Sequence, residues 1–256
     1  MVQPKELKAV IVGVGHVGAT TANTLQLQAS RGEALDLTDS AAASGSYNVE
    51  VYAGSYKDCT DASFVIITAG HQEELSETHV DLLRAKYRNI QDVIPKIARY
   101  VSRSSILIIA THTVEALTYA AYKLSSLPSC QVFGCGTALT TSRFRLELAK
   151  HYAVNPRDVY AVIAGKHDSQ CYVAGWSNIT IDGVRVRDFC EQTGRMYEQE
   201  ELFACYLRAK QAAIEIMESK GSPSFSMAAG LASIVKALVE NGNAMLTVSV
   251  VGSIWA

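Results

Sequence analysis

The fold is decided by residues 9–28, AVIVGVGHVGATTANTLQLQ. The opening AVIV is apolar and predicts a buried strand, and the closing ATTANTLQLQ has a helical pattern. The loop between them has glycines at 13, 15 and 18, the GxGxxG spacing of dinucleotide-binding turns. Gly13 permits the tight turn, Gly15 lets the backbone approach a pyrophosphate, and Gly18 allows a helix to pack closely on a strand. A glycine-rich turn that binds no ligand is the alternative.

Strands and helices alternate along the first half of the chain. Apolar runs at 64–68 and 106–110 predict two more buried strands, and residues 80–100 have helical spacing with Pro95 as an expected kink. This alternation up to about residue 135 predicts an α/β fold, a Rossmann-type doubly wound parallel sheet. The ends of such strands are where ligands bind.

From residue 140 onward the pattern changes, and we expect an α+β half. The expected elements are a helix at 142–152, a strand at 159–163, a hairpin at 173–186 that turns at Asp182-Gly183, helices at 197–219 and 225–241, and a strand at 246–251. We therefore predict a dinucleotide-binding domain over residues 1–139 and a substrate domain over residues 140–256.

Composition narrows the class of protein. The 256 residues are 48% hydrophobic, with 23 basic and 25 acidic side chains, which predicts a globular protein that binds neither nucleic acid nor a membrane surface. The six cysteines include no CxxC pair, so we expect no metal site. The apolar run near the N-terminus is too short for a signal peptide or membrane span. A cytoplasmic enzyme acting on a small molecule is the expectation.

Seven segments occur in an order that carries a family resemblance: GEALDL (32–37), YAGSYKDCTDASFVIITAG (52–70), SETHVDLL (76–83), LTYAAYKLSSLP (117–128), GCGTALTTSRFR (134–145), NPRDVYAVIAGKHDS (155–169) and KGSPSFSMAAGLASIVKAL (220–238). Together with the glycine loop they resemble the L-lactate/malate dehydrogenase family. The resemblance implies NAD as cofactor, a small 2-hydroxy or 2-oxo acid as substrate, and a homo-oligomer.

The resemblance also implies site residues. His167 in AGKHDS matches the histidine that gives and takes the substrate's proton, and imidazole suits this role near neutral pH. Arg143 in TSRFR matches the arginine that holds the substrate carboxylate, which a planar guanidinium does with two parallel hydrogen bonds. The expected cofactor-binding residues are Gly13, Gly15, His16, Val17, Gly18, Thr68, Ala69 and Gly70.

Several site positions depart from the family pattern. His79 stands where a loop arginine polarises the substrate carbonyl, and Thr140 stands where a carboxylate orients the catalytic histidine. Glu73 occupies the position that selects the substrate, where a carboxylate would repel an acid. His112 and Thr113 replace the asparagine and proline of the substrate pocket, and Pro223 replaces a pocket threonine.

The chain is also expected to lack parts of the family's fold. LQLQAS runs directly into RGEALDL, so the second strand and its ribose-binding acid are missing, and Glu33 and Asp36 belong to the segment that follows. The sequence stops at Ala256, where the family continues with further sheet and a helix. Three hypotheses remain open: a dehydrogenase with impaired activity, a non-catalytic binding or scaffolding protein, and a truncated, spliced or rebuilt form of an active enzyme.

Overall fold

The computed structural model describes residues 7–13, 15, 17, 31–43, 50–69, 79–166, 172–241 and 243–252. Their contacts divide the chain into two compact units. The first contains Met1–Cys135, Ser224–Ala244 and Val248–Ala256, and the second contains Gly136–Pro223 and Met245–Thr247. The expected domain boundary at residues 139 and 140 remains a prediction, because a unit of contacts need not be a domain that folds alone.

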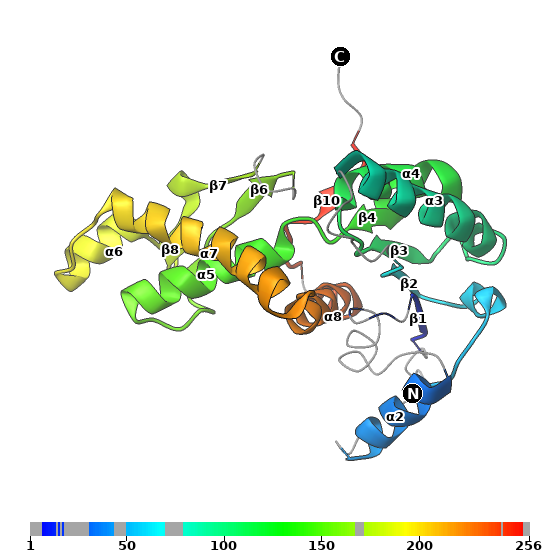
Figure 1. Ribbon diagram of the computed structural model, residues 1–256. Coiled ribbons are helices and arrows are strands. Elements are labelled where there is room, and N and C mark those ends of the chain that lie inside the picture. Colours follow the sequence, from blue (N-terminus) through cyan, green and yellow to red (C-terminus); the bar gives the residue numbers. More distant parts are fainter. Residues whose placement is uncertain are drawn as a thin grey trace. The chain divides into compact units, whose positions relative to one another are not determined.

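The first unit is built on a five-stranded sheet (Figure 1). Its strands lie in the order β1 (Ala9–Val12), β2 (Phe64–Ile67), β3 (Ile106–Ile109), β4 (Val132–Gly134) and β10 (Ser249–Val250). The first four are parallel, and β10 runs antiparallel to β4. The central strands β2 and β3 are apolar and almost wholly buried, as strands covered on both faces require. The predicted α/β fold with a parallel sheet is confirmed.

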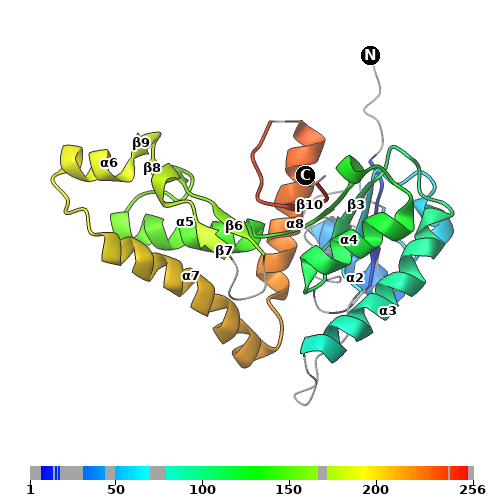
Figure 2. The same cartoon turned by 90° about the horizontal axis from the view of Figure 1, so that it is seen from above.

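Helices cover both faces of this sheet. α3 (His79–Ala98) packs against α4 (Val114–Ser125), and both views place α8 (Ser224–Glu240) on the other side of the strands (Figures 1 and 2). The other helical elements of this unit are α2 (Arg31–Ala43), η1 (Tyr56–Cys59) and η2 (Ser129–Gln131). α3 buries Ile90, Ile94 and Ile97 and continues through Pro95 for its last turn. The helix expected after Gly18 lies outside the described residues.

The β1 edge of the sheet bears on the expected missing strand. In the part of the chain that the structure describes, β1 pairs with β2 and with no strand on its other side. β1 is nevertheless buried, with Val10 5% exposed and Ile11 7% exposed. The loss of the family's second strand stays a prediction.

Where the structure describes it, the second unit contains small antiparallel sheets and the helices α5, α6 and α7. Its elements are α5 (Ala138–Tyr152), β5 (Val159–Tyr160), β6 (Ile163–Gly165), β7 (Tyr172–Ala174), η3 (Trp176–Asn178), β8 (Thr180–Ile181), β9 (Val184–Arg185), α6 (Val186–Thr193) and α7 (Gln199–Lys220). Strand β8 lies between β5 and β9, while β6 pairs with β7. Helices α5 and α7 pack against each other.

Two expected elements of this unit are corrected. The strand predicted at 159–163 divides into β5 and β6, which belong to different sheets. The hairpin predicted at 173–186 also divides, because η3 separates β7 from the shorter hairpin of β8 and β9. The turn at Asp182-Gly183 is confirmed, since both residues have positive φ angles, 50° and 76°, as a two-residue hairpin turn needs.

Phe144 on α5 is the largest side chain that is fully buried in this structure, and it anchors the core of the second unit. Its ring meets those of Trp176 and Tyr206 edge to face, at centroid distances of 6.0 and 6.1 Å. We expect Phe144→Ala to lower the free energy of unfolding by about 3–5 kcal/mol, through lost burial and a cavity. Urea unfolding tests this, with half-exposed Phe203→Ala as control. An equal loss of unfolding free energy in the two variants would contradict the placement of Phe144 at the centre of this core.

Candidate functional site

The carboxyl ends of β1, β2 and β3 are tied together by hydrogen bonds. The backbone N–H of Ala69 donates to the carbonyl of Val12 at 2.9 Å, and the Thr68 hydroxyl donates to the carbonyl of Gly13. The Thr111 hydroxyl at the end of β3 donates to the carbonyl of Ala69 at 2.8 Å. These contacts fix three strand ends at the edge where α/β sheets bind ligands.

Gly13 and Gly15 have different surroundings in the glycine loop. Gly13 has φ +105°, and a Cβ there would overlap the backbone of Ala69. A Cβ on Gly15 would meet nothing within 4 Å, and Gly15 is exposed. Gly13 is therefore required by the turn itself. The open space at Gly15 fits the close approach of a pyrophosphate to the backbone.

We expect Gly13→Ala to destabilise the first unit. The positive φ alone costs an L residue roughly 1–2 kcal/mol, and the overlap with Ala69 adds to it. Gly15→Ala is the matched control, because its methyl group has room and its stability should stay within about 1 kcal/mol. Thermal unfolding of the two variants checks this. Equal melting temperatures would show that the turn is not held as described.

His112 and Thr113 follow β3 at the same edge of the sheet. The His112 side chain is exposed, and its Nδ1 lies 3.5 Å from the Nζ of Lys86 on α3. Thr113 precedes α4 in a left-handed conformation, φ 65° and ψ 40°, which is strained for a β-branched residue. Strain of this kind gathers at functional sites.

In the second unit, buried threonines at the start of α5 hold the strand that leads to His167. The Thr141 hydroxyl accepts the backbone N–H of Ile163 at 3.1 Å, and the Thr137 hydroxyl donates to the Ile163 carbonyl. Ile163 begins β6, and β6 and β7 flank residues 166–171. Thr140 in the same turn is 2% exposed. His167 lies outside the described residues, so its relation to Thr140 stays a prediction.

Two neighbouring arginines on α5 have distinct surroundings. Arg145 donates from Nε to the carbonyl of Ala161 at 2.8 Å and lies over the Tyr160 ring, so it has a structural role. Arg143 is half-buried, and burial lowers its pKa while nearby Tyr172 raises it. A guanidinium remains charged in proteins. Arg143 therefore keeps the positive charge that recognition of a carboxylate requires, and its role as the substrate arginine stays a prediction.

Several predicted site residues lie together at the carboxyl ends of the strands. The structure brings together Gly13, Thr68 and Ala69, with His112 on the next strand end. His79 is the first residue of α3, and its side chain is outside the described part. His16, Gly18, Gly70 and Glu73 lie outside the described residues. Lys86 was missed by sequence reasoning, although its position four residues after Leu82 and four before Ile90 places it on the buried face.

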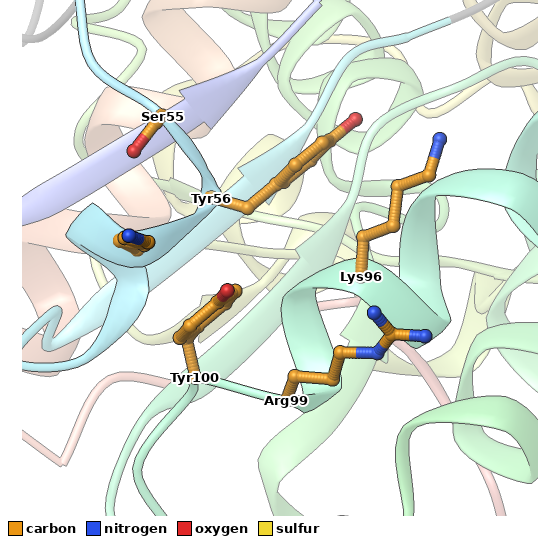
Figure 3. A pocket seen from close by; sticks show the side chains of 6 residues that line it. Ser55, Tyr56, Lys96, Arg99 and Tyr100 are labelled. Carbon is orange, nitrogen blue, oxygen red and sulfur yellow. The ribbon is translucent and has the colours of Figure 1, made fainter.

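Two surface hollows lie away from these residues. One, of about 350 Å³, lies between η1 and the end of α3 and has a basic and aromatic lining (Figure 3): Ser55, Tyr56, Lys57, Lys96, Arg99 and Tyr100. Its segments precede β2 and β3, so it lies at the amino ends of the strands. The other, of about 300 Å³, is lined by Trp176, Gln199, Glu200 and Phe203. Neither includes a predicted site residue.

The described residues also lack two features that other classes of protein would show. They contain no helix long and apolar enough to cross a membrane. They also contain no group of three or more histidine, cysteine, aspartate or glutamate side chains arranged to hold a metal ion.

The sequence matches two family descriptions that together span most of the chain. Residues 7–134 match the lactate/malate dehydrogenase NAD binding domain, and residues 137–253 match the lactate/malate dehydrogenase alpha/beta C-terminal domain. The first match confirms NAD as the cofactor predicted from the sequence.

Individual relatives agree with these matches. A probable L-lactate dehydrogenase of Schizosaccharomyces pombe is 40% identical over 96% of this chain and 77% of its own length. The L-lactate dehydrogenase of Acetivibrio thermocellus is 37% identical over 94% of this chain and 80% of its length. The ligand-bound crystal structure of the minor L-lactate dehydrogenase from Enterococcus mundtii has a TM-score of 0.88 and 34% identity, covering 98% of this chain and 83% of that one. The chain belongs to the NAD-dependent lactate/malate dehydrogenase family.

Proposed function

We propose that this chain interconverts a small 2-oxo acid and its L-2-hydroxy acid with NAD, as a lactate-type dehydrogenase whose turnover is slow. The observation that carries the proposal is the 40% identity to a probable L-lactate dehydrogenase across nearly the whole chain. Fold alone would not support an activity, since one fold hosts many functions. The proposal is also supported by the retained glycine loop, Arg143 and His167, whose chemistry suits cofactor binding, carboxylate binding and proton transfer.

Each retained residue has a role that its chemistry supports. The loop at Gly13 and Gly15 receives the pyrophosphate, and bound nicotinamide supplies or accepts the hydride. Arg143 binds the substrate carboxylate through two parallel hydrogen bonds, which orients carbon 2. His167 gives a proton to the carbonyl oxygen during reduction and takes it back during oxidation.

The altered residues explain why we propose slow turnover. Reduction builds negative charge on the carbonyl oxygen, and His79 is a weaker donor than the arginine it replaces. Thr140 can orient an imidazole but cannot stabilise its charged form. Glu73 would repel an acidic substrate. Among the candidate substrates, monocarboxylic 2-oxo acids fit better than dicarboxylic ones, since a second carboxylate would meet this repulsion directly.

The same altered residues support a second candidate, a non-catalytic binding protein. Such a protein would keep the glycine loop and core and have no chemical activity. Binding of NADH without oxidation in the presence of any 2-oxo acid would favour it over the dehydrogenase. We also propose a homo-oligomer, as implied by the family resemblance, which sedimentation of the purified chain would test.

The test of the proposed function is oxidation of NADH, followed by absorbance, against a panel of monocarboxylic and dicarboxylic 2-oxo acids. We expect slow oxidation with pyruvate, and a KM for pyruvate about ten- to a hundredfold higher in Arg143→Lys, which keeps the charge but loses the paired donors. Exposed Arg157→Lys is the control. No oxidation with any acid, or an unchanged KM in Arg143→Lys, would contradict the proposal.

A further inference from the structure

Lys86 on α3 is a buried cation without an assigned role. Among the residues whose burial the structure describes, it is the one charged side chain that is buried, at 3% exposed. Removing an ammonium from water is costly unless polar groups compensate for the lost hydration. A lysine kept on an apolar helix face therefore needs a reason in its local contacts.

The contact with His112 restricts the protonation of that imidazole. The Nζ of Lys86 is 3.5 Å from Nδ1 of His112, at the long end of hydrogen-bond distance. An ammonium group has donors and no acceptor, so Nδ1 must offer its lone pair. A neutral imidazole then carries its proton on Nε2.

The backbone holds His112 at the edge of the sheet where the cofactor loop begins. On one side, the Thr111 hydroxyl donates to the carbonyls of Ala69 and Ile67. On the other, Thr113 has a left-handed backbone and donates its hydroxyl to the His112 carbonyl. The exposed imidazole is therefore fixed at its base, while the buried ammonium selects which ring nitrogen is the donor.

We propose that Lys86 is a positioning residue whose ammonium holds His112 as the Nε2–H tautomer, so that the imidazole donates a hydrogen bond to the oxygen on carbon 2 of the bound 2-oxo acid. This inference rests on the proposed function. The hydrogen bond stabilises the charge that grows on this oxygen during reduction, in a chain where His79 has replaced the loop arginine. Lys86 acts through His112 and does not contact the substrate.

Nitrogen NMR of the histidine side chains tests the contact without substrate or cofactor. Two-bond proton–nitrogen correlations distinguish protonated from unprotonated ring nitrogens, and His112→Asn assigns the signals of His112. We expect Nε2 protonated and Nδ1 unprotonated in the parent. Lys86→Met keeps a long unbranched side chain but removes the charge, and it should give a mixture of His112 tautomers. Lys86→Arg keeps the charge and should give the same spectrum as the parent. Lys96→Met is the control, because Lys96 lies on the same helix and is exposed and paired with Asp92.

Kinetics tests the contact between His112 and the substrate. We expect kcat/KM for pyruvate to fall about three- to tenfold in Lys86→Met, the value of one neutral hydrogen bond, with the Kd of NADH unchanged and activity restored in Lys86→Arg. A protonated Nδ1 in the parent, or an unchanged tautomer in Lys86→Met, would overturn the proposal. So would a Lys86→Met variant as active as Lys96→Met. A parent that reduces no 2-oxo acid refutes the proposed function and the substrate contact, whereas its spectrum still tests the Lys86 contact separately.

Discussion

With saturating NADH, this chain should reduce pyruvate at least about 100-fold more slowly than ordinary lactate dehydrogenases, because loss of one well-placed charge donor costs ~10²–10³ in rate. The family resemblance places His79 at the position of that donor. Thr140 stands at the position of the carboxylate that orients the histidine, and in the serine-protease template that loss costs up to ~10⁴. The two losses do not multiply, because residues that act together are non-additive.

Restoring the two family residues tests this explanation. We expect His79→Arg to raise kcat for pyruvate about tenfold or more, and His79→Arg with Thr140→Asp to raise it further. Thr140 is 2% exposed, so a carboxylate there is tolerated only if His167 pairs with it. Urea unfolding of each variant separates a rate effect from a loss of fold. A parent that already turns over at ordinary dehydrogenase rates would refute the account.

Affinity for NADH should be about ten- to a hundredfold weaker than in the relatives, since one charge-assisted hydrogen bond to the ribose contributes roughly 1.5–3 kcal/mol. This prediction rests on the expectation from the family resemblance that the sequence lacks the strand and acid about 20 residues beyond the glycines.

Titration calorimetry of NADH measures this affinity. Gly15→Ala should weaken binding further, because its methyl group enters the open space that the pyrophosphate needs, while melting temperature stays near that of the parent. An ordinary micromolar Kd in the parent would show that ribose recognition is intact. A Gly15→Ala variant with the parent's affinity would show that the pyrophosphate does not approach this loop.

The parallel sheet could be predicted from sequence because its strands are uninterrupted apolar runs. Val65, Ile66 and Ile67 are wholly buried. A short apolar run without polar residues is typical of a strand covered on both faces of a parallel sheet. Asp182-Gly183 could also be predicted, because a two-residue turn with positive φ angles restricts residue type. In both cases the residue types needed for the strand or the turn lie within a few neighbouring positions of the sequence.

Elements that depend on distant contacts could not be predicted in the same way. β5 and β6 are separated by only two residues, yet they pair with partners from different sheets. Their division follows from tertiary contacts, such as the Gly175 N–H donating to the Val162 carbonyl at 2.9 Å. The sequence of residues 159–165 contains no glycine or proline between the two strands that would indicate where β5 ends and β6 begins.

Part of the candidate site could be predicted from sequence motifs, and part of it depends on tertiary packing. Gly13 was predicted from the spacing of the glycines, and its φ angle explains the requirement. The contact between Lys86 and His112 joins residues 26 apart on a helix and a strand end, and no motif contains both. Lys86 has the helical spacing of the buried face of α3, but periodicity cannot show that its ammonium lies near His112.

The central claim is that this chain transfers a hydride between NADH and a 2-oxo acid, however slowly. The most direct measurement uses NADH with deuterium at both C4 positions, excess pyruvate and mass spectrometry of the product. The account predicts lactate carrying one deuterium at carbon 2, formed by the parent and reduced about ten- to a hundredfold in Arg143→Lys at low pyruvate. Absence of deuterated lactate after prolonged incubation, with NADH binding demonstrated in the same sample, would contradict the account.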